Sequence, residues 1–136
     1  MAHVRPGVHA DSPKVPTLVM QGGPNARLWA ITEDSVAFYD VVADGWVGVP
    51  EPQEGREGMP SDHVAASDGS LWMGTWGHGA YRLRYDKGDR IAEWTHYTAM
   101  DGLASNGVHA LREDGSGAIW FVTDAGLSRF GERPSP

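Results

Sequence analysis

The stretch "DGLASNGVHALREDGSGAIWFVTDAGLSRF", residues 101–130, alternates turn-forming segments with short apolar runs. Its central run, "IWFVT" (119–123), follows the turn-forming "EDGSGA" and precedes a second short run, "GLSRF". A continuous apolar run of this length between turn signals indicates a strand that is buried on both faces. No window of the chain carries an apolar helical stripe free of Gly and Pro. We therefore predict an all-β fold, with strands here at 108–113, 119–123 and 127–130.

The same central run occurs twice earlier in weaker form, as "LWAIT" (28–32) and "LWMGT" (71–75). Trp29, Trp72 and Trp120 each stand three residues before a Thr, and they lie 43 and 48 positions apart (72 − 29 and 120 − 72). Three units of about 45 residues, each with four short strands, are typical of β-propeller blades. We expect these Trp residues to fill the space between neighbouring blades.

The units divide the chain into segments. We predict an N-terminal leader over residues 1–15, followed by blades over residues 16–50, 51–98 and 99–136. The third blade is expected to lack its outer strand, whereas the outer strands of the first two are expected to contain Trp46 and Trp94.

The third unit resembles the two-component-regulator propeller repeat. That repeat is recognised by a "DGL.SN.V" turn, an acidic-Gly turn, a "W..T" strand and a "GL.R" strand. The second unit matches it in part (residues 59–75), and "GAIWF" gives a weaker similarity to streptogramin-lyase-type propellers. The resemblance implies a sensory module whose propeller face binds a ligand. The matching residues are Asp101, Gly102, Leu103, Ser105, Asn106, Val108, Asp114, Gly117, Trp120, Thr123, Gly126, Leu127 and Arg129.

Composition excludes several classes of protein. The chain has 136 residues and a formal net charge of −7, so we expect no nucleic-acid partner, because phosphate binding needs a basic surface. No apolar run is long enough to cross a bilayer, and the N-terminal residues lack the apolar stretch of a secretory signal. The absence of cysteine excludes disulfides. We expect a cytoplasmic protein with no membrane partner.

Chain direction in a four-stranded blade determines which loops share a face of the propeller. The connections between blades and the turns between second and third strands fall on one face, which we call the binding face, because functional residues of a scaffold tend to lie on such loops. The loops concerned are residues 32–35, 50–63, 75–79, 98–106 and 123–126.

Histidines and acidic residues on this face carry the candidate chemistry. We name His63, His109, Asp62 and Asp101 as candidate catalytic residues. Imidazoles that converge on the propeller axis would bind a divalent ion (zinc, manganese or calcium) and activate a water molecule. The candidate metal ligands are His63, His78 and His109. No HExxH motif or EF-hand loop is present. The alternative is that the histidines hydrogen-bond to neighbouring strands and the acidic residues cap turns.

A second set of residues is a candidate for ligand binding. Trp76 lies in "TWGHGA", where the equivalent turns read "TEDS" and "TDAG", so it breaks the repeat. An indole between glycines on a loop is suited to stacking on a sugar or another flat ligand. The alternative is that Trp76 packs against the neighbouring blade. The candidate ligand-binding residues are Trp76, His78, Asp124 and Glu33.

Two functions remain open at this point. The first is a ligand-binding, sensory-type module for a small molecule. The second is a small propeller enzyme at the mouth of the central channel, either a metal-dependent hydrolase of esters, lactones or phosphoesters, or a lyase. The chain has no GxSxG elbow, no P-loop and no Cys nucleophile, which argues against standard nucleophilic hydrolases and nucleotide enzymes.

The number of blades predicts an assembly of several chains. Closed propellers typically have four to eight blades, and three cannot close around an axis. We expect the chain to complete its ring by self-association, with the 1–15 leader as the missing outer strand of a partner's third blade. A homodimer, with six blades, is expected ahead of a homotrimer.

Overall fold

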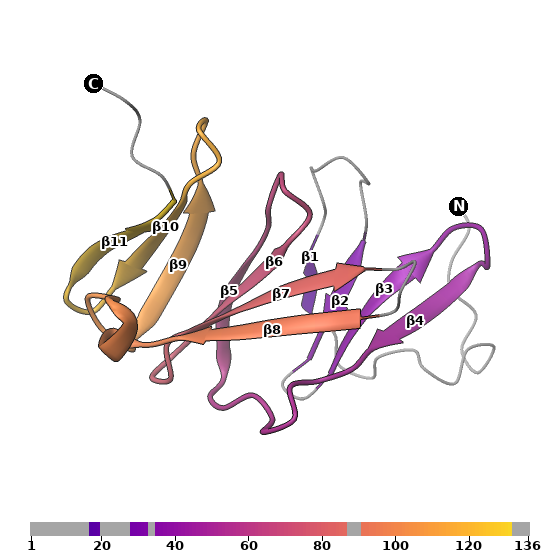
Figure 1. Ribbon diagram of the computed structural model, residues 1–136, viewed down its shortest axis with the longest axis horizontal. Coiled ribbons are helices and arrows are strands. Elements are labelled where there is room, and N and C mark those ends of the chain that lie inside the picture. Colours follow the sequence, from indigo (N-terminus) through magenta and orange to yellow (C-terminus); the bar gives the residue numbers. More distant parts are fainter. Residues whose placement is uncertain (1–16, 20–27, 33–34, 87–90, 132–136) are drawn as a thin grey trace.

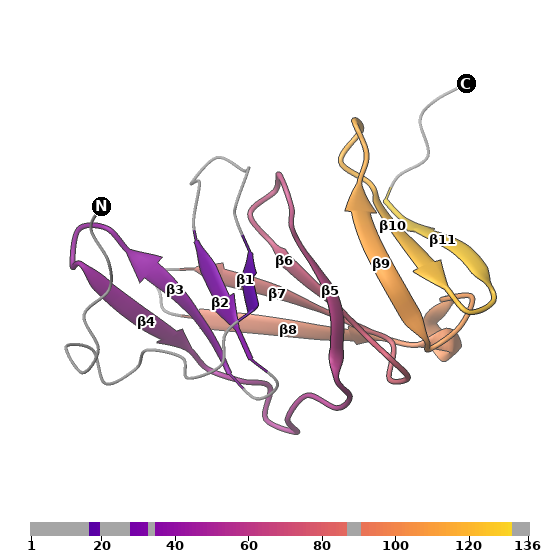
Figure 2. The ribbon, with the colours of Figure 1, turned by 180° about the vertical axis from the view of Figure 1, so that it is seen from behind.

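The computed structural model describes residues 17–19, 28–32, 35–86 and 91–131. These residues form three antiparallel sheets that stand side by side in chain order (Figures 1 and 2). The first contains β1 (Thr17–Val19), β2 (Trp29–Ile31), β3 (Val36–Asp40) and β4 (Gly45–Val49), and the second contains β5 (Pro60–Ala65), β6 (Leu71–Thr75), β7 (Ala80–Asp86) and β8 (Ile91–Tyr97). The third contains β9 (Val108–Glu113), β10 (Ile119–Thr123) and β11 (Gly126–Phe130). We call them blades 1, 2 and 3.

Within each blade, strands that are consecutive in the chain pair as neighbours in an up-and-down meander. The predicted all-β fold is confirmed, and the apolar runs of the sequence lie on the second strand of each blade, as expected. Trp46 and Trp94 lie on the outer strands β4 and β8. The described residues of blade 3 form three strands rather than four, and one 3-10 turn (Ala99–Asp101) precedes it.

Two apolar clusters join the blades. Trp29, Ile31 and Phe38 of blade 1 pack against Leu71 and Met73 of blade 2. On the other side of blade 2, Trp72 packs against Leu111, Ile119 and Phe121 of blade 3. Successive residues of a strand point to opposite faces, so one five-residue strand contributes to both clusters. This explains why β6 is buried along its whole length.

The equivalent Trp residues all point towards the following blade, which corrects the prediction for Trp120. Trp29 and Trp72 are 2% and 1% exposed, as predicted. Trp120 is only partly buried, because no described blade follows blade 3. Val122 and Leu127 on the same face of blade 3 are 40% and 64% exposed. We call this surface the open face of blade 3.

The turns between the first and second strands of blades 2 and 3, opposite the binding face, each carry an aspartate that lies near the Trp of the second strand. Asp114 Oδ1 accepts hydrogen bonds from the backbone and hydroxyl of Ser116, and Asp114 Oδ2 accepts one from Trp120 Nε1 at 2.7 Å. The hydrogen bonds from Ser116 and Trp120 hold the pKa of Asp114 well below its usual range. Asp68 makes the corresponding bonds to Ser70, and its ion pair with Arg82 (2.8 Å) places that guanidinium over the Trp72 ring. Turn capping, rather than chemistry, is the role expected for these aspartates.

A β-bulge lies at the same position in blades 2 and 3, next to the binding face. In blade 2 the pairing passes from Pro60–Thr75 to Asp62–Gly74, which leaves Ser61 as the extra residue. In blade 3 it passes from Val108–Thr123 to Ala110–Val122, which leaves His109 as the extra residue. A bulge turns the side chain of the extra residue out of the regular ladder. The innermost strands of blades 2 and 3 therefore each have one residue outside the regular ladder, next to the binding face.

Candidate functional site

The loops of the binding face lie against one another, as the chain direction predicted. Backbone hydrogen bonds join the turn of one blade to the connection that enters or leaves it. Trp76 N donates to Met59 O (3.2 Å), Gly79 N to Asn106 O (2.8 Å) and Asp124 N to Gly107 O (3.0 Å). The strands thus fix the positions of these loops, and the side chains on them form a defined surface.

Three of the predicted site residues meet between blades 2 and 3. The rings of Trp76 and His109 lie edge to face, with centroids 5.3 Å apart. His109 Nε2 is hydrogen-bonded to Asp124 Oδ1. Trp76 comes from the turn of blade 2, His109 from the bulge of blade 3, and Asp124 from the turn of blade 3. We call these three residues the Trp76 cluster.

The Trp76 cluster is open to solvent and has an exposed apolar neighbour. Trp76 is 55% exposed, and the side chains of His109 and Asp124 are 45% and 61% exposed. Met59, whose carbonyl accepts from Trp76 N, is 55% exposed. An indole half open to water, at a place where the repeat has Asp124, is not needed for the core. The Trp76 ring also contacts His109 of blade 3, so its role as a binding platform stays a prediction beside that of blade-to-blade contact.

Gly107 makes room for the carboxylate of this cluster. A Cβ atom at position 107 would lie 2.0 Å from Asp124 Oδ2, so any side chain there must displace Asp124. Met59 occupies the equivalent place opposite Trp76 in blade 2. This position thus holds a large residue in blade 2 and a glycine in blade 3. The sequence alone gave no reason to single out Gly107.

His78 lies on the same turn as Trp76 but has a different carboxylate partner. Its Nδ1 is 3.1 Å from Glu57 Oε2, and its backbone N–H donates to Thr75 Oγ1. The carbonyl of His78 is 2.5 Å from His96 Nε2, and the His96 ring stacks on Tyr81 with centroids 4.1 Å apart. His78 and His109 therefore belong to two separate imidazole–carboxylate pairs.

His63 does not face the channel mouth with His109. The pairing places His63 opposite Met73, whereas the residue opposite the equivalent Phe121 is Leu111. His63 thus occupies the Leu111 position of its blade, on the face towards blade 1. Its Nε2 is buried and has no hydrogen-bond partner among the described residues. Burial lowers the pKa of His63, and the nearby Arg56 charge also lowers it, against an opposing effect of Asp62.

The remaining acidic candidates have structural roles. Asp62 Oδ2 accepts from Leu111 N (2.9 Å) and Arg112 Nη1 (2.8 Å), and so links the innermost strands of blades 2 and 3. Asp101 forms a capping box with Thr98 at the 3-10 turn. Glu33 lies outside the described residues. Asp101 thus caps a turn and Asp62 links two strands, and the candidate catalytic role of each stays a prediction.

The described residues do not bring the candidate metal ligands together. Within the ranges given above, no group of three His, Cys, Asp or Glu residues has the spacing to hold a metal ion. His63 faces blade 1, and His78 and His109 each have their own carboxylate. Whether a zinc, manganese or calcium ion binds this protein stays a prediction.

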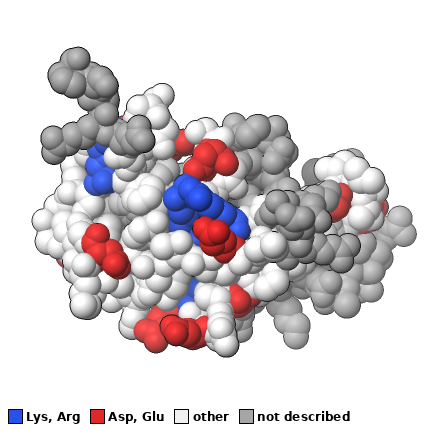
Figure 3. Space-filling view, viewed as in Figure 1, with Lys and Arg blue, Asp and Glu red and all other residues white. Residues whose placement is uncertain are grey.

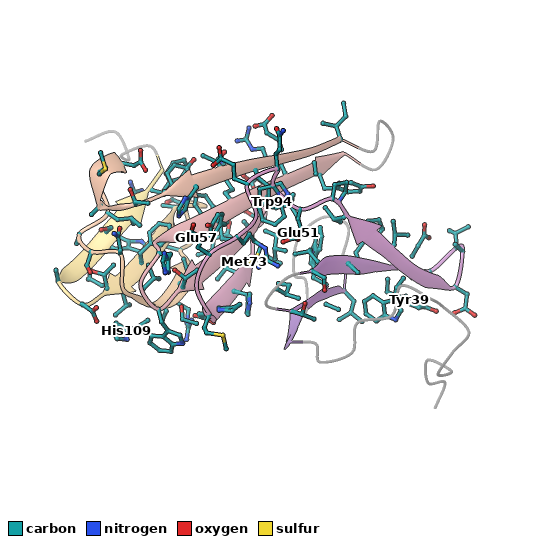
Figure 4. The ribbon with its side chains drawn as sticks, turned by 90° about the horizontal axis from the view of Figure 1, so that it is seen from below. Tyr39, Glu51, Glu57, Met73, Trp94 and His109 are labelled. Atoms are coloured by element: carbon teal, nitrogen blue, oxygen red, sulfur yellow. The ribbon has the colours of Figure 1, made fainter. Side chains whose placement is uncertain are left out.

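Arg56 is a central residue of this face that sequence reasoning missed. Its side chain is only 4% exposed and is paired with Glu51 (2.6 Å). Its Nη2 donates to the carbonyls of Thr32 (3.1 Å) and Ser35 (3.3 Å) in the turn of blade 1. Figure 4 shows Glu51, Met73 and Trp94 gathered where this side chain binds: Nη1 contacts Met73 Sδ, and the guanidinium lies over Trp94. Nothing in the sequence indicated that Arg56 is buried, because it lies in a loop rich in Glu and Gly.

We expect the His63 imidazole to make stability depend on pH. Its folded-state pKa is lowered, so the unfolded chain takes up the proton more readily. The stability that this histidine contributes is present above its ordinary pKa, near 6.5, and is lost as the pH falls below that value. His63→Leu, which copies Leu111, should reduce the loss of melting temperature between pH 7.5 and 5.5.

The matched control for this measurement is His96→Gln, because the His96 side chain is exposed on the outer strand. It should leave the pH slope close to that of the parent protein. An unchanged slope in His63→Leu would show that His63 is not the buried titrating group.

Comparison with known proteins supports the repeat and the fold. Residues 102–125 match the family model described as "Two component regulator propeller", which confirms the resemblance of the third unit to that repeat. No curated protein matches the chain. The matched segment includes Gly107, the bulged His109 and Asp124.

Two solved structures resemble the whole arrangement of blades. One is the extracellular domain of a putative hybrid two component system from B. thetaiotaomicron, with a TM-score of 0.59 and 19% identity over 84% of this chain. The other, an extracellular domain of a putative one component system from the same organism, has a TM-score of 0.60 and 18% identity over 84% of this chain. This chain spans 16% of the length of either structure. At these identities the likeness establishes the fold: the three sheets are β-propeller blades.

The expected cytoplasmic location is contradicted by this comparison, because both structures are extracellular domains. The expectation depended on the absence of cysteine, of a secretory signal and of an apolar run long enough to cross a bilayer. The absence of cysteine excludes disulfides only, and the apolar clusters between these blades join them without any. Separately, none of the helices among the described residues is long and apolar enough to cross a membrane.

Proposed function

We propose that this chain is part of a sensory propeller of the two-component-regulator type, placed outside the cytoplasm, and that its binding face holds a small molecule. The observation that carries the proposal is the Trp76 cluster, in which an exposed indole, an imidazole and a carboxylate meet on the loops of two blades. The matched repeat and the extracellular structural relatives support the sensory assignment.

The geometry suits recognition of a flat ligand. The Trp76 ring offers an apolar surface to one side of a sugar or another ring, and stacking of this kind stabilises complexes by about 0.5–1.5 kcal/mol beyond area burial. His109 contacts the Trp76 ring and is hydrogen-bonded to Asp124, so both residues provide polar atoms that would fix the orientation of a ligand on the indole.

Substitution of Trp76 tests this function. In a thermal-shift screen of small sugars and ring compounds, we expect at least one compound to raise the melting temperature of the parent protein. Trp76→Ala should abolish that shift and leave the melting temperature without ligand nearly unchanged, because the side chain is 55% exposed.

Val42→Ala is the matched control, since Val42 is 94% exposed on the turn between β3 and β4, away from the binding face. It should keep the ligand response. A ligand that shifts Trp76→Ala as much as the parent protein would place the site elsewhere.

No described arrangement favours the enzyme alternative, a metal-dependent hydrolase or a lyase. His109 and Asp124 are paired, but no Ser, Thr or Lys nucleophile is hydrogen-bonded to His109 in the described part of the chain. We therefore rank ligand binding first. Metal analysis of the purified protein remains the direct measurement for the alternative.

The proposed ring closure by self-association draws support from the open face of blade 3. Trp120, Arg129 and Asp114 repeat the arrangement of Trp72, Arg82 and Asp68, with Arg129 over the Trp120 ring at 5.9 Å. In blade 2 this arrangement is covered by blade 3. The same chemistry on blade 3 is suited to a further blade, which in a homodimer or homotrimer comes from another copy.

A further inference from the structure

The charged side chains around Trp76 determine which charge on a ligand this surface favours. The Trp76 cluster contains one imidazole–carboxylate pair, His109 with Asp124, and the turn that carries Trp76 contributes a second, His78 with Glu57. The carboxylates are 61% and 69% exposed. Each pair thus brings one exposed carboxylate to this face.

Basic residues nearby do not cancel these charges. Arg112, on the same strand as His109, is paired with Asp62 of β5, and Arg56 is buried against Glu51. Asp101, in the connection that leads to β9, adds another carboxylate. Both described arginines of this face are thus already neutralised. On the side of the molecule seen in Figure 3, the largest patch of Lys and Arg, near the centre, likewise lies next to Asp and Glu side chains.

We propose that the Trp76 cluster binds the positively charged ammonium group of its ligand, with the cation against the indole and paired with Asp124. This deepens the function proposed above and rests on it. A cation within about 6 Å of an indole centroid is attracted by the ring, and Trp is the best of the aromatic side chains in this role. A carboxylate attracts the same group over a screening length of about 8 Å at physiological salt. It repels an anion and adds little for a neutral ring.

One carboxylate oxygen of Asp124 is left to pair with the ammonium group. Oδ1 is occupied by His109, whereas Oδ2 lies over Gly107, which contributes no side chain. Gly107 is thus a positioning residue for the carboxylate. Its φ is not in the left-handed region, so the effect of Gly107→Ala should come from contact with Asp124 rather than from backbone strain.

The test compares choline with its uncharged carbon isostere, 3,3-dimethyl-1-butanol, in titrations followed by tryptophan fluorescence at constant ionic strength. We expect saturable choline binding, and binding of the isostere at least about fivefold weaker. Trp76→Ala and Asp124→Asn should each weaken choline by about fivefold to tenfold. Gly107→Ala should weaken choline in the same direction. Glu93→Gln, a charge removed from the exposed outer strand of blade 2, should have no effect.

Equal affinities for choline and the isostere would overturn the cation inference, as would no choline binding at all. The function proposed above would stand in either case if a ring compound from the thermal-shift screen still depended on Trp76, and would fail separately if none did.

Discussion

Trp72→Ala is expected to lower the free energy of unfolding by about 3–5 kcal/mol, the range for deletion of a large buried aromatic side chain. Trp72 is 1% exposed, stacks on Tyr97 with centroids 5.5 Å apart, and meets Phe121 edge to face. Its removal leaves a cavity between blades 2 and 3. It also removes the ring over which the Arg82 guanidinium lies, 5.0 Å from the centroid. Urea denaturation followed by circular dichroism measures the change.

Trp120→Ala is the matched comparison, because it removes the same side chain from the same repeat position. In dilute protein it should cost about 1–2 kcal/mol, mainly through the lost hydrogen bond to Asp114 and the partial burial of the ring. At high concentration it should also shift any assembly towards the single chain, as measured by light scattering. Equal losses for the two variants in dilute protein would mean that Trp120 is covered within one chain.

Arg56→Met is expected to destabilise the protein by about 3–5 kcal/mol, although methionine fills much of the same volume. The substitution removes the guanidinium that pairs with Glu51 and donates to the carbonyls of Thr32 and Ser35. Removal of the buried member of an ion pair, together with its hydrogen bonds, is strongly destabilising. The melting temperature and the denaturation midpoint should both fall strongly.

Two further variants control for this result. Arg56→Lys keeps the charge but cannot form the forked contacts of a guanidinium, so it should recover only part of the loss. Arg84→Ala removes an exposed arginine from β7 and should change stability by no more than about 0.5 kcal/mol. If Arg56→Met and Arg84→Ala were equally mild, Arg56 would not join blades 1 and 2 as described.

The blades were predictable because the repeat consists of short apolar runs that recur along the chain. A strand packed on both faces must be apolar throughout, and "LWMGT" and "IWFVT" satisfy this requirement. The direction in which each Trp side chain points, towards the following blade, was harder to predict from the sequence. It depends on register, and a shift of one residue moves a side chain to the opposite face of a sheet. Trp120 was therefore placed on the correct strand, but its burial was overestimated.

The site was predictable in part for the same reason. Trp76 broke the repeat, and the loop rule placed it on one face with Asp124 and His109, where the three residues meet. His63 and His109 looked alike in the sequence because each stands near the start of an innermost strand. The bulge separates them, since it shifts the register by one residue before His63 and places His109 at the extra position itself. Bulges of this kind carry little sequence signal.

The shared bulge places different kinds of side chain at one equivalent position in blades 2 and 3. Ser61 and His109 occupy it, both outside the regular ladder, but the Ser61 hydroxyl is buried whereas the His109 side chain is 45% exposed. One distortion of the backbone therefore accommodates a small buried side chain in one blade and an exposed imidazole in the next. Neighbouring blades of the same architecture can thus differ in the chemistry that they present beside the binding face.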